Sequence, residues 1–335
     1  MSPLSTLLIA GALGLGVGVL SWWAVGRVRL WLLARQILDQ PTDRGMHHVA
    51  VPRGGGLGVL TALVPGWLVA ALLLPGAAPG WWLIPAAAVA LAALSFWDDR
   101  HGLGPAPRFL VQMLAVALGL AALPDDALIA QGILPWWLDR ALAWFLWLWL
   151  VNLTNFMDGI DGISGSHAAL IGLGLALIAW ASGSYAQIGW GLAVAGAALG
   201  FLIWNWHPAK LFLGDVGSIP LGYLTGWLLI LAAADGAWAA ALILPAFYWG
   251  DATSTLLLRL LRGEKVWRPH RQHAYQRAVQ HGQRPDEVVR TLAGWGVVLI
   301  GLAWLSLSGG VMLLIALAAA AAGTGALILV FRSAA

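Results

Sequence analysis

Long apolar stretches separated by short polar segments run along the whole 335-residue chain. Most are close to 20 residues, the length that an α-helix needs to cross a hydrocarbon core about 30 Å thick. Helices are expected because backbone polar groups in lipid must be hydrogen-bonded within the spanning segment. The sequence therefore predicts an all-α, polytopic transmembrane helical bundle in a single domain, 1–335, with about eleven spans. The expected spans are residues 4–26, 54–76, 80–97, 109–124, 133–153, 162–182, 186–206, 216–234, 236–258, 291–308 and 310–331.

Basic residues are distributed unevenly between the two sets of connecting segments. Every Lys and Arg except Arg140 falls in one set of loops or in the C-terminal tail. By the positive-inside rule this set faces the cytoplasm, which places the N-terminus in the periplasm and the C-terminus in the cytoplasm. The first apolar stretch lacks a basic start and a small-residue cleavage site, so we expect a retained helix. The cytoplasmic loops lie near residues 27–53, 98–108, 154–161, 207–215 and 259–290.

Composition supports a membrane protein and excludes some chemistry. Hydrophobic residues make up 60% of the chain and charged residues 10%, against about 25% charged in soluble domains. The absence of cysteine excludes disulfides, thiol nucleophiles and thiolate metal sites. The net charge of +3 does not indicate a nucleic-acid partner, because the basic residues lie in loops between spans. A transporter would place polar groups near mid-membrane, whereas here they gather at one interface, which favours surface chemistry with a partner from the bilayer.

The segment SFWDDRHGLGPAPRFLVQ contains an adjacent acidic pair, Asp98 and Asp99, at the end of the third expected span. Neighbouring carboxylates repel each other and need a cation or a shared proton. They would suit Mg²⁺, cationic side chains that hold phosphate, or a base. The alternative is two solvated loop acids beside Arg100.

The segment NLTNFMDGIDGISG (152–165) places a polar residue at every third position. Residues three apart share a helix face, but glycines in this segment favour a helix end or a loop over a polar pocket. An ordinary polar turn is the weaker alternative, because four amide and acid groups between two spans are hard to explain as packing. The four residues are Asn152, Asn155, Asp158 and Asp161.

The segment HPAKLFLGDVGS (207–218) supplies Lys210, Phe212 and Asp215. Asp215 directly precedes a span, where an oxygen ligand can meet Mg²⁺ and a diphosphate. The flanking glycines permit close backbone approach to a ligand. Phe212 is a candidate stacking surface for a base, with packing as the alternative.

Two basic segments are further candidates for ligand binding. RPHRQHAYQR (268–277) places His270 and His273 among Arg268 and Arg271, which suits a sugar-nucleotide diphosphate. Anionic lipid headgroups would suit the same charges. Arg53 precedes three consecutive glycines in DQPTDRGMHHVAVPRGGGLG (39–58), which also holds His47 and His48. That segment fits a phosphate-binding turn, or only a glycine-rich helix entry.

Two further ionisable residues are expected inside spans. Asp251 is a functional candidate by default, because acids within the membrane are costly to bury. His167 is equally compatible with a hydrogen bond to a neighbouring helix.

Taken in order, these motifs resemble the polyprenyl-phosphate N-acetylhexosamine-1-phosphate transferases (glycosyltransferase family 4). The family includes the enzymes that initiate O-antigen synthesis and the phospho-N-acetylmuramoyl-pentapeptide transferase of peptidoglycan synthesis. The resemblance covers nearly the whole chain, from PRGGG to the histidine segment. It implies that undecaprenyl phosphate attacks the sugar-bearing phosphorus of a UDP-N-acetylhexosamine and releases UMP.

The resemblance also implies roles for individual residues. Mg²⁺, with Mn²⁺ as an alternative, would be held by Asp215 and the Asn155 region. Asp98 and Asp99 would engage the lipid phosphate, and Phe212 would stack on uracil. The remaining residues implied to act in catalysis or substrate binding are Asp158, Asp161, His270, His273, Arg53, Asn152, Lys210, Arg268 and Arg271.

One segment departs from part of the family. The peptidoglycan enzyme has consecutive histidines where this chain has His-Arg-Gln-His. The chain looks most like the O-antigen-initiating branch, whose donors include UDP-GlcNAc and 6-deoxy aminosugars such as UDP-FucNAc and UDP-QuiNAc. The resemblance implies a bacterial inner-membrane location with a cytoplasmic active site, and it is compatible with a homodimer.

Overall fold

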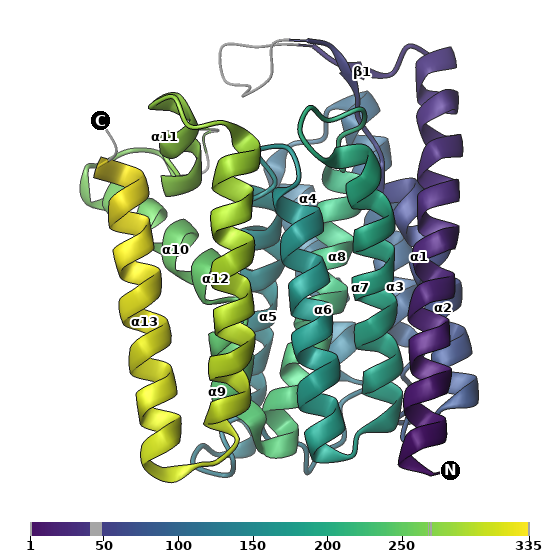
Figure 1. Ribbon diagram of the computed structural model, residues 1–335, viewed down its shortest axis with the longest axis vertical. Coiled ribbons are helices and arrows are strands. Elements are labelled where there is room, and N and C mark those ends of the chain that lie inside the picture. The colour runs from purple at the N-terminus through teal and green to yellow at the C-terminus, as the bar shows by residue number, and fades with distance from the viewer. Residues whose placement is uncertain (1, 41–48, 267, 269, 334–335) are drawn as a thin grey trace.

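Long helices form an upright bundle with the two chain termini at opposite ends (Figure 1). The computed structural model describes residues 2–40, 49–266, 268 and 270–333; His47 and His48 lie outside this part of the chain. The helical architecture is confirmed, with one addition: two short antiparallel strands, β1 (Leu38–Asp39) and β2 (Val51–Pro52), which the sequence did not predict. The helices are α1 (Pro3–Ala34), α2 (Gly56–Leu73), α3 (Leu83–His101), α4 (Pro105–Leu120), α5 (Trp136–Phe156), α6 (Ile163–Ser182), α7 (Tyr185–Asn205), α8 (Asp215–Ala232), η1 (Ala233–Ala237), α9 (Trp238–Ile243), α10 (Ala246–Leu261), α11 (Ala274–Gln280), α12 (Pro285–Ser306) and α13 (Gly310–Ser333).

Within the described residues, 7 helical segments are long and apolar enough to cross a membrane. The expected number of eleven therefore stays a prediction. The expected spans that do not qualify correspond to α3, to α4, which is short at 16 residues, and to α5, whose first turns contain Asp139 and Arg140. The seven segments are Pro3–Ala34, Gly56–Leu73, Ile163–Ser182, Tyr185–Asn205, Asp215–Ile243, Pro285–Ser306 and Gly310–Ser333.

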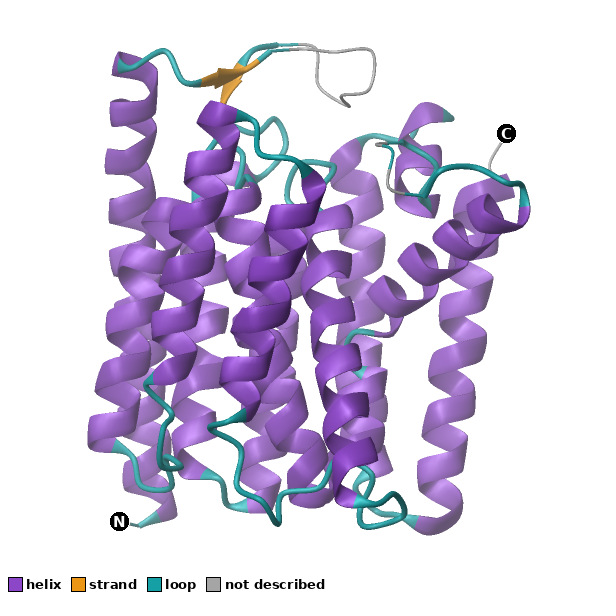
Figure 2. Cartoon of the chain, turned by 180° about the vertical axis from the view of Figure 1, so that it is seen from behind, coloured by secondary structure: helices purple, strands orange, loops and turns teal. Residues whose placement is uncertain are grey.

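The expected span 236–258 is not a single helix. The chain continues from α8 through the π-helical turn η1 into α9, and Gly236 takes a φ of 94° within that turn. A break follows at Pro245, after which α10 begins at Ala246. Proline lacks the N–H that a continuous helix needs at this point. As a result α10 is inclined to the upright helices around it (Figures 1 and 2).

Helix α8 forms the centre of the bundle. Every residue from Val216 to Ala232 is buried, and α8 packs against α3, α5 and α6. A helix that is apolar and buried on all sides is fixed by its neighbours rather than by lipid. Asp215, its first residue, is therefore held at a defined depth.

Polar groups at the end of the bundle near the N-terminus are satisfied by local contacts. Asp139 accepts hydrogen bonds from the backbone N–H of Ile129 (3.1 Å) and Ala130 (2.8 Å). Arg140 donates to the carbonyls of Ala127 and Pro124. These interactions shape the turns at that end, whereas the expected functional residues lie at the opposite end.

Helix boundaries at that opposite end differ from those expected. Helix α3 continues to His101, so Asp98 and Asp99 lie in its last turn rather than in a loop. Helix α1 extends to Ala34, well past the expected end at residue 26. In contrast, α5 ends at Phe156, which agrees with a helix end inside the asparagine-aspartate motif.

Candidate active site

Backbone hydrogen bonds join the glycine-rich segment after Arg53 to the segment around Phe212. The amide of Phe212 donates to the carbonyl of Pro52 (2.8 Å), and the amides of Gly54 (3.1 Å) and Gly55 (2.8 Å) donate to the carbonyl of Phe212. The sequence left open a phosphate-binding turn or a glycine-rich helix entry for these glycines, and the amides of Gly54, Gly55 and Gly56 are all used in hydrogen bonds to Phe212 and Leu213. The contact places Arg53 beside the start of α8.

Two glycines allow this close approach. A Cβ atom added to Gly56 would lie 2.2 Å from the Cα of Gly217, which no real structure accommodates without backbone movement. Gly56 is the first residue of α2, and Gly217 lies in the first turn of α8. The two helix N-termini therefore meet through bare backbone, and the side chains at their ends face a common space.

Two arginines converge on the carboxylate of Asp215. Arg53 Nη2 lies 2.7 Å from Asp215 Oδ1, and Arg108 Nη2 lies 2.5 Å from Asp215 Oδ2. Arg108 also reaches back to Asp98, with Nη1 2.8 Å from Oδ2. Arg53 Nη2 is 3.9 Å from Asp99 Oδ1. The result is one charged network that unites the ends of α3, α4 and α8 with the segment before α2.

The asparagine-aspartate motif forms the adjoining wall. Asn155 donates to Ser218 Oγ on α8 (2.9 Å). Asp158 accepts a hydrogen bond from Ser164 Oγ (2.6 Å). Asp161 Oδ2 lies 2.7 Å from His207 Nδ1 and accepts from the amide of Ala209 (3.0 Å). Asp161 thus holds the chain after α7, whereas the second carboxylate oxygen of Asp158 accepts no side-chain hydrogen bond from the residues that the structure describes.

These segments surround a cavity of about 430 Å³. Six of the predicted residues line it, namely Arg53, Asn155, Asp158, Asp161, Phe212 and Asp215. Asp98 and Asp99 are outside its wall and connect to it through Arg108 and Arg53. The cavity therefore contains acids, an amide, a guanidinium and an aromatic ring, the groups expected for a phosphate-bearing ligand with a base.

Burial shifts the protonation of several of these groups. Loss of hydration raises the pKa of Asp99 to about 6, against an opposing effect of Arg53. Loss of hydration also raises the pKa of Asp158 to about 6, and the hydrogen bond from Ser164 opposes this. Burial by itself would lower the pKa of Arg53, but Asp215 and Asp99 raise it above its usual value. Arg53 is consequently charged at any working pH.

A Mg²⁺ ion shared with a substrate would reach Asp215 only if a guanidinium moved away, because both carboxylate oxygens of Asp215 are paired with Arg53 and Arg108. Among the described residues, no group of three or more His, Asp or Glu side chains is placed to hold a metal by itself. Mg²⁺ usually takes one or two carboxylates, and waters and substrate phosphates fill its other positions. Asp215, Asn155 and Asp158 line one cavity and supply such oxygens. Their arrangement suits a metal that binds together with a diphosphate.

The predicted histidines lie outside this cavity. His273 is buried, with its ring centroid 4.8 Å from that of His270, and neither lines the cavity with the acids. Burial lowers the pKa of His270 to about 4 and that of His273 to about 3. Both rings are therefore neutral near pH 7. Helix α11, which follows His273, does reach the cavity, because Gln276 is part of the cavity wall.

Four other predicted residues do not line the cavity. Asn152 donates to the carbonyl of Leu148 on its own helix (2.8 Å). Lys210 is exposed, and its carbonyl accepts from Arg29 Nε (3.2 Å). Arg268 and Arg271 are exposed and have no ion pair with another described residue. Their roles in substrate binding stay predictions.

The structure adds site residues that sequence reasoning missed. Arg108, Ser164, His207 and Ser218 each hold one of the predicted polar groups. Arg108 lies in the first turn of α4, shortly after Gly104 and Pro105 start that helix. A basic residue at a helix start close to an acidic pair was the available signal. The two serines carried no signal, since serine is common at helix starts.

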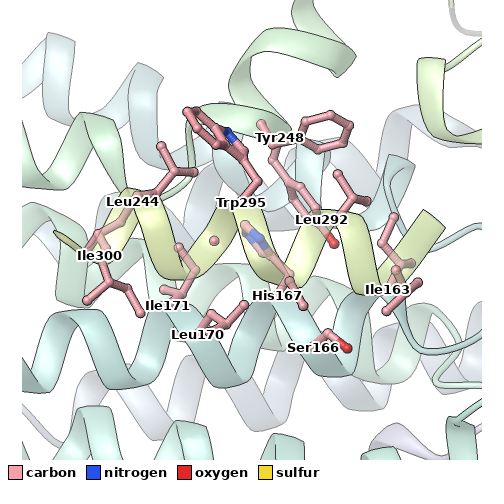
Figure 3. Close-up of a pocket in the computed structure, with 15 residues that line it drawn as sticks. Ile163, Ser166, His167, Leu170, Ile171, Leu244, Tyr248, Leu292, Trp295 and Ile300 are labelled. Carbon is pink, nitrogen blue, oxygen red and sulfur yellow. The ribbon is translucent and has the colours of Figure 1, made fainter. Parts of the chain in front are cut away.

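His167 lies apart from this site in a small cavity of about 30 Å³ (Figure 3). Its ring stacks on that of Tyr248, with centroids 3.5 Å apart. The labelled neighbours in Figure 3 are mostly apolar, including Leu170 and Trp295. This environment suits a packing role.

The chain is similar to a family of known proteins. Residues 81–233 match the model of a family described as "Glycosyl transferase family 4". A probable undecaprenyl-phosphate N-acetylglucosaminyl 1-phosphate transferase of Bacillus subtilis is 30% identical over 258 residues, which cover 73% of this chain and 70% of the relative. A decaprenyl-phosphate N-acetylglucosaminephosphotransferase of Mycolicibacterium smegmatis is 30% identical over 332 residues, 87% of this chain and 80% of the relative. A phospho-N-acetylmuramoyl-pentapeptide-transferase of Synechococcus is 28% identical over 314 residues, 85% of this chain and 84% of the relative.

Proposed function

Because the chain belongs to glycosyl transferase family 4, we propose that it is a membrane enzyme that transfers N-acetylhexosamine 1-phosphate from a UDP-sugar to undecaprenyl phosphate. UDP-GlcNAc, or a 6-deoxy aminosugar such as UDP-FucNAc or UDP-QuiNAc, is the proposed donor. Two relatives are named for a polyprenyl phosphate and an N-acetylglucosamine phosphate. The proposed product begins a lipid-linked polysaccharide such as O-antigen.

The convergence of Arg53 and Arg108 on Asp215 carries this proposal. Two substrates that both bear phosphate repel each other, so a site that joins them needs fixed positive charge. The two guanidiniums supply part of it next to a cavity of about 430 Å³ that Phe212 also lines, and because Asp98, Asp99 and Asp215 already pair with them, the proposed Mg²⁺ would supply the rest. Asp215, Asp98 and Asp99 hold these guanidiniums in place before any ligand arrives.

The proposed reaction is a single displacement at phosphorus. An oxygen of undecaprenyl phosphate forms a bond to the β-phosphorus of the UDP-sugar while the bond from that phosphorus to the bridging oxygen breaks. The bridging oxygen leaves on UMP, and the sugar phosphate becomes part of a lipid diphosphate. An ionised lipid phosphate is already a nucleophile, so this scheme requires no protein base.

The residues of the chain would act on charge and position. Arg53 and Arg108 would neutralise the approaching phosphates, and Asp158, with its second carboxylate oxygen, would face the donor side of the cavity. Asp215 and Asn155 would hold Mg²⁺, which would supply additional positive charge at the diphosphate. Asp161 would keep the cavity wall in place through His207 and Ala209.

We place the protein in a bacterial inner membrane, with the cavity facing the cytoplasm. The seven apolar helices and the membrane-enzyme relatives support a multi-pass membrane protein. The concentration of basic residues at the cavity end supports the cytoplasmic orientation under the positive-inside rule. The UDP-sugar would then enter from the cytoplasm and the lipid phosphate from the bilayer.

UMP release from purified protein tests the proposal. The protein, Mg²⁺ and undecaprenyl phosphate are combined with UDP-GlcNAc, UDP-FucNAc, UDP-QuiNAc or UDP-MurNAc-pentapeptide in separate reactions. We expect UMP with one of the first three donors and at least a 100-fold loss in Asp215→Asn. The absence of UMP with every donor would overturn the proposal.

The fourth donor tests a second candidate function. Several relatives at 28–34% identity are phospho-N-acetylmuramoyl-pentapeptide transferases. UMP release only from UDP-MurNAc-pentapeptide would assign the chain to that reaction instead. A transporter without catalysis would release no UMP and leave the lipid unchanged.

A further inference from the structure

Asp251 is a fully buried acid in α10 that accepts two backbone hydrogen bonds from another element. Its Oδ1 accepts a hydrogen bond from the amide of Ala274 (2.8 Å), and its Oδ2 accepts from the amide of Tyr275 (3.4 Å). These amides are the first two of α11. A carboxylate at this position satisfies helix-start donors that have no partner within the helix. Asp251 thus fixes where α11 begins.

Helix α11 in turn contacts the turn that carries Asp158. Tyr275 is fully buried, and its hydroxyl donates to the carbonyl of Phe156 (3.2 Å). A Cβ added to Gly159 would lie 2.1 Å from the Tyr275 hydroxyl and 2.9 Å from Gln276 Nε2. The residues after Asp158 therefore rest directly on α11, and Gln276 completes the cavity wall beside them.

A second group of contacts holds Asp251 from within α10 and from α13. Thr255 Oγ1 donates to Asp251 Oδ1 (3.1 Å). Arg332 lies 3.6 Å from the same oxygen and donates to Thr255 Oγ1 (2.8 Å) and Ser254 Oγ (2.9 Å). These contacts give the buried acid a charged partner. A buried acid with partners on three helices has a fixed orientation.

We propose that Asp251 is a positioning residue that sets the donor side of the cavity through α11. It holds Tyr275 and Gln276 against the turn at Phe156–Gly159, and so fixes the direction of Asp158. This inference rests on the proposed function for its kinetic consequence, but the mechanical link between Asp251 and the turn is independent of it. Asp251 does not itself line the cavity.

Packing alone would not require this arrangement. Replacing a buried acid and its partners by apolar groups is often neutral or stabilising. Here the acid instead accepts hydrogen bonds from two backbone amides of a seven-residue helix that borders the cavity. Its removal should therefore affect the geometry of the wall beyond any loss of stability.

Hydrogen–deuterium exchange in detergent tests the mechanical link without requiring activity. In Asp251→Asn, an NH2 group replaces one of the two accepting oxygens, so one α11 amide loses its acceptor and faces a donor instead, and we expect exchange to increase at least fivefold in both 274–280 and 155–163. In Tyr275→Phe, which removes only the hydroxyl bond to Phe156, we expect the increase in 155–163 alone. Thr255→Val is the matched control, because it removes a contact to Asp251 but leaves the bonds to α11, and both segments should keep their wild-type exchange.

Kinetics then separates positioning from a purely structural role. In folded Asp251→Asn, we expect the KM for the UDP-sugar to rise about tenfold while the KM for undecaprenyl phosphate changes less than twofold. The double variant Asp251→Asn/Tyr275→Phe should be no worse than Asp251→Asn, since both act through one contact.

Two outcomes would overturn the inference. One is exchange that increases only in 274–280 in Asp251→Asn, or in neither segment. The other is a loss of activity explained entirely by a smaller folded fraction, with both KM values unchanged. If Asp251→Asn does not fold, unchanged exchange of 155–163 in Tyr275→Phe overturns it. A wild-type protein that releases no UMP would refute the proposed function and leave the exchange result standing.

Discussion

The guanidinium of Arg108 lies 2.5 Å from the carboxylate of Asp215, although the two residues are 107 positions apart in the chain. The same guanidinium reaches Asp98 at 2.8 Å. One side chain at the start of α4 thus joins the end of α3 to the start of the central helix α8. This contact combines the separate polar motifs into one site.

Removal of Arg108 should disable the enzyme. Arg108→Ala leaves Asp98 buried without its partner and withdraws one of two positive charges from Asp215. We expect kcat/KM to fall about 100-fold, which corresponds to about 2.7 kcal/mol. UMP release at saturating and limiting donor measures this effect.

Two variants control for that result. Arg108→Lys keeps the charge but cannot bridge two carboxylates with a planar fork, so it should recover only part of the activity. Arg140→Ala, at the opposite end of the bundle, should keep wild-type kcat per folded molecule. Equal kcat/KM in Arg108→Ala and wild type would refute the role of the network.

The meeting of α2 and α8 should not tolerate a methyl group. Gly56→Ala places Cβ 2.2 Å from the backbone of Gly217, and no flexible side chain is available to move. We expect a loss of about 1–3 kcal/mol of unfolding free energy, the usual cost of overpacking, together with lower activity. Thermal unfolding in detergent measures the loss.

Gly11→Ala is the matched control, since nothing lies within 4 Å of a Cβ at that position in α1. It should unfold at the wild-type temperature or slightly above, because alanine favours helix over glycine. Equal stability of Gly56→Ala and Gly11→Ala would mean that the two helix ends are not in contact.

Acid should destabilise the fold through His273. Burial lowers its pKa to about 3 in the folded protein, against 6.5 for a free side chain. Between these values the unfolded chain binds more protons than the folded one, so stability from this group falls as pH decreases below 6.5. His270, with a pKa lowered to about 4 by burial, acts in the same direction.

The comparison of variants isolates this effect, because Asp99 and Asp158 have raised pKa values and act in the opposite direction. The difference in stability between wild type and His273→Gln should shrink as pH falls from 7.5 to 5. Exposed His281 provides the control, and His281→Gln should keep the wild-type pH profile of thermal unfolding. A pH-independent difference for His273→Gln would contradict a neutral buried imidazole.

Activity should also fall on the acidic side, through the buried carboxylates. Asp158 has a pKa raised to about 6 by burial, and it loses its negative charge as pH decreases through that value. We therefore expect kcat/KM to decline below pH 6. Ser164→Ala removes the hydrogen bond that lowers the pKa of Asp158. The decline of kcat/KM at acidic pH (the acidic limb of the pH profile) should therefore begin at a higher pH.

A profile of kcat/KM from pH 5 to 8 with both proteins checks this prediction. Ser182→Ala is the control, since its hydroxyl contacts only carbonyls of α6 and Ser184. An acidic limb that stays at the same pH in Ser164→Ala would mean that Asp158 is not the group responsible.

The sequence predicted the helical bundle because apolar length and charge position are properties of local segments. It also predicted six residues of the cavity wall, since each motif occurs at the end of an expected helix. It did not predict the break before α10, where hydropathy stays high through Pro245 and the apolar run resembles one span. The hydropathy of an apolar segment does not show whether its helix is broken. The proline was the local signal for a break at this position.

Contacts between residues far apart in the chain could not be predicted from sequence motifs. Arg108 and Ser218 matter because of the residues opposite them, and only the fold shows those pairings. In the histidine segment, charge and spacing favoured His270 and His273, whereas the fold places Gln276 at the cavity, so the roles of the two histidines stay predictions. The sequence shows that Asp251 is an acid within an apolar stretch, but it does not show the residues that contact Asp251.

The most direct test of the account is the mass of the lipid after incubation with Mg²⁺, undecaprenyl phosphate and a UDP-N-acetylhexosamine. We predict undecaprenyl diphosphate carrying one N-acetylhexosamine, formed in a one-to-one ratio with UMP and absent in Asp215→Asn. Undecaprenyl phosphate of unchanged mass, with every donor and with intact folded protein, would contradict it.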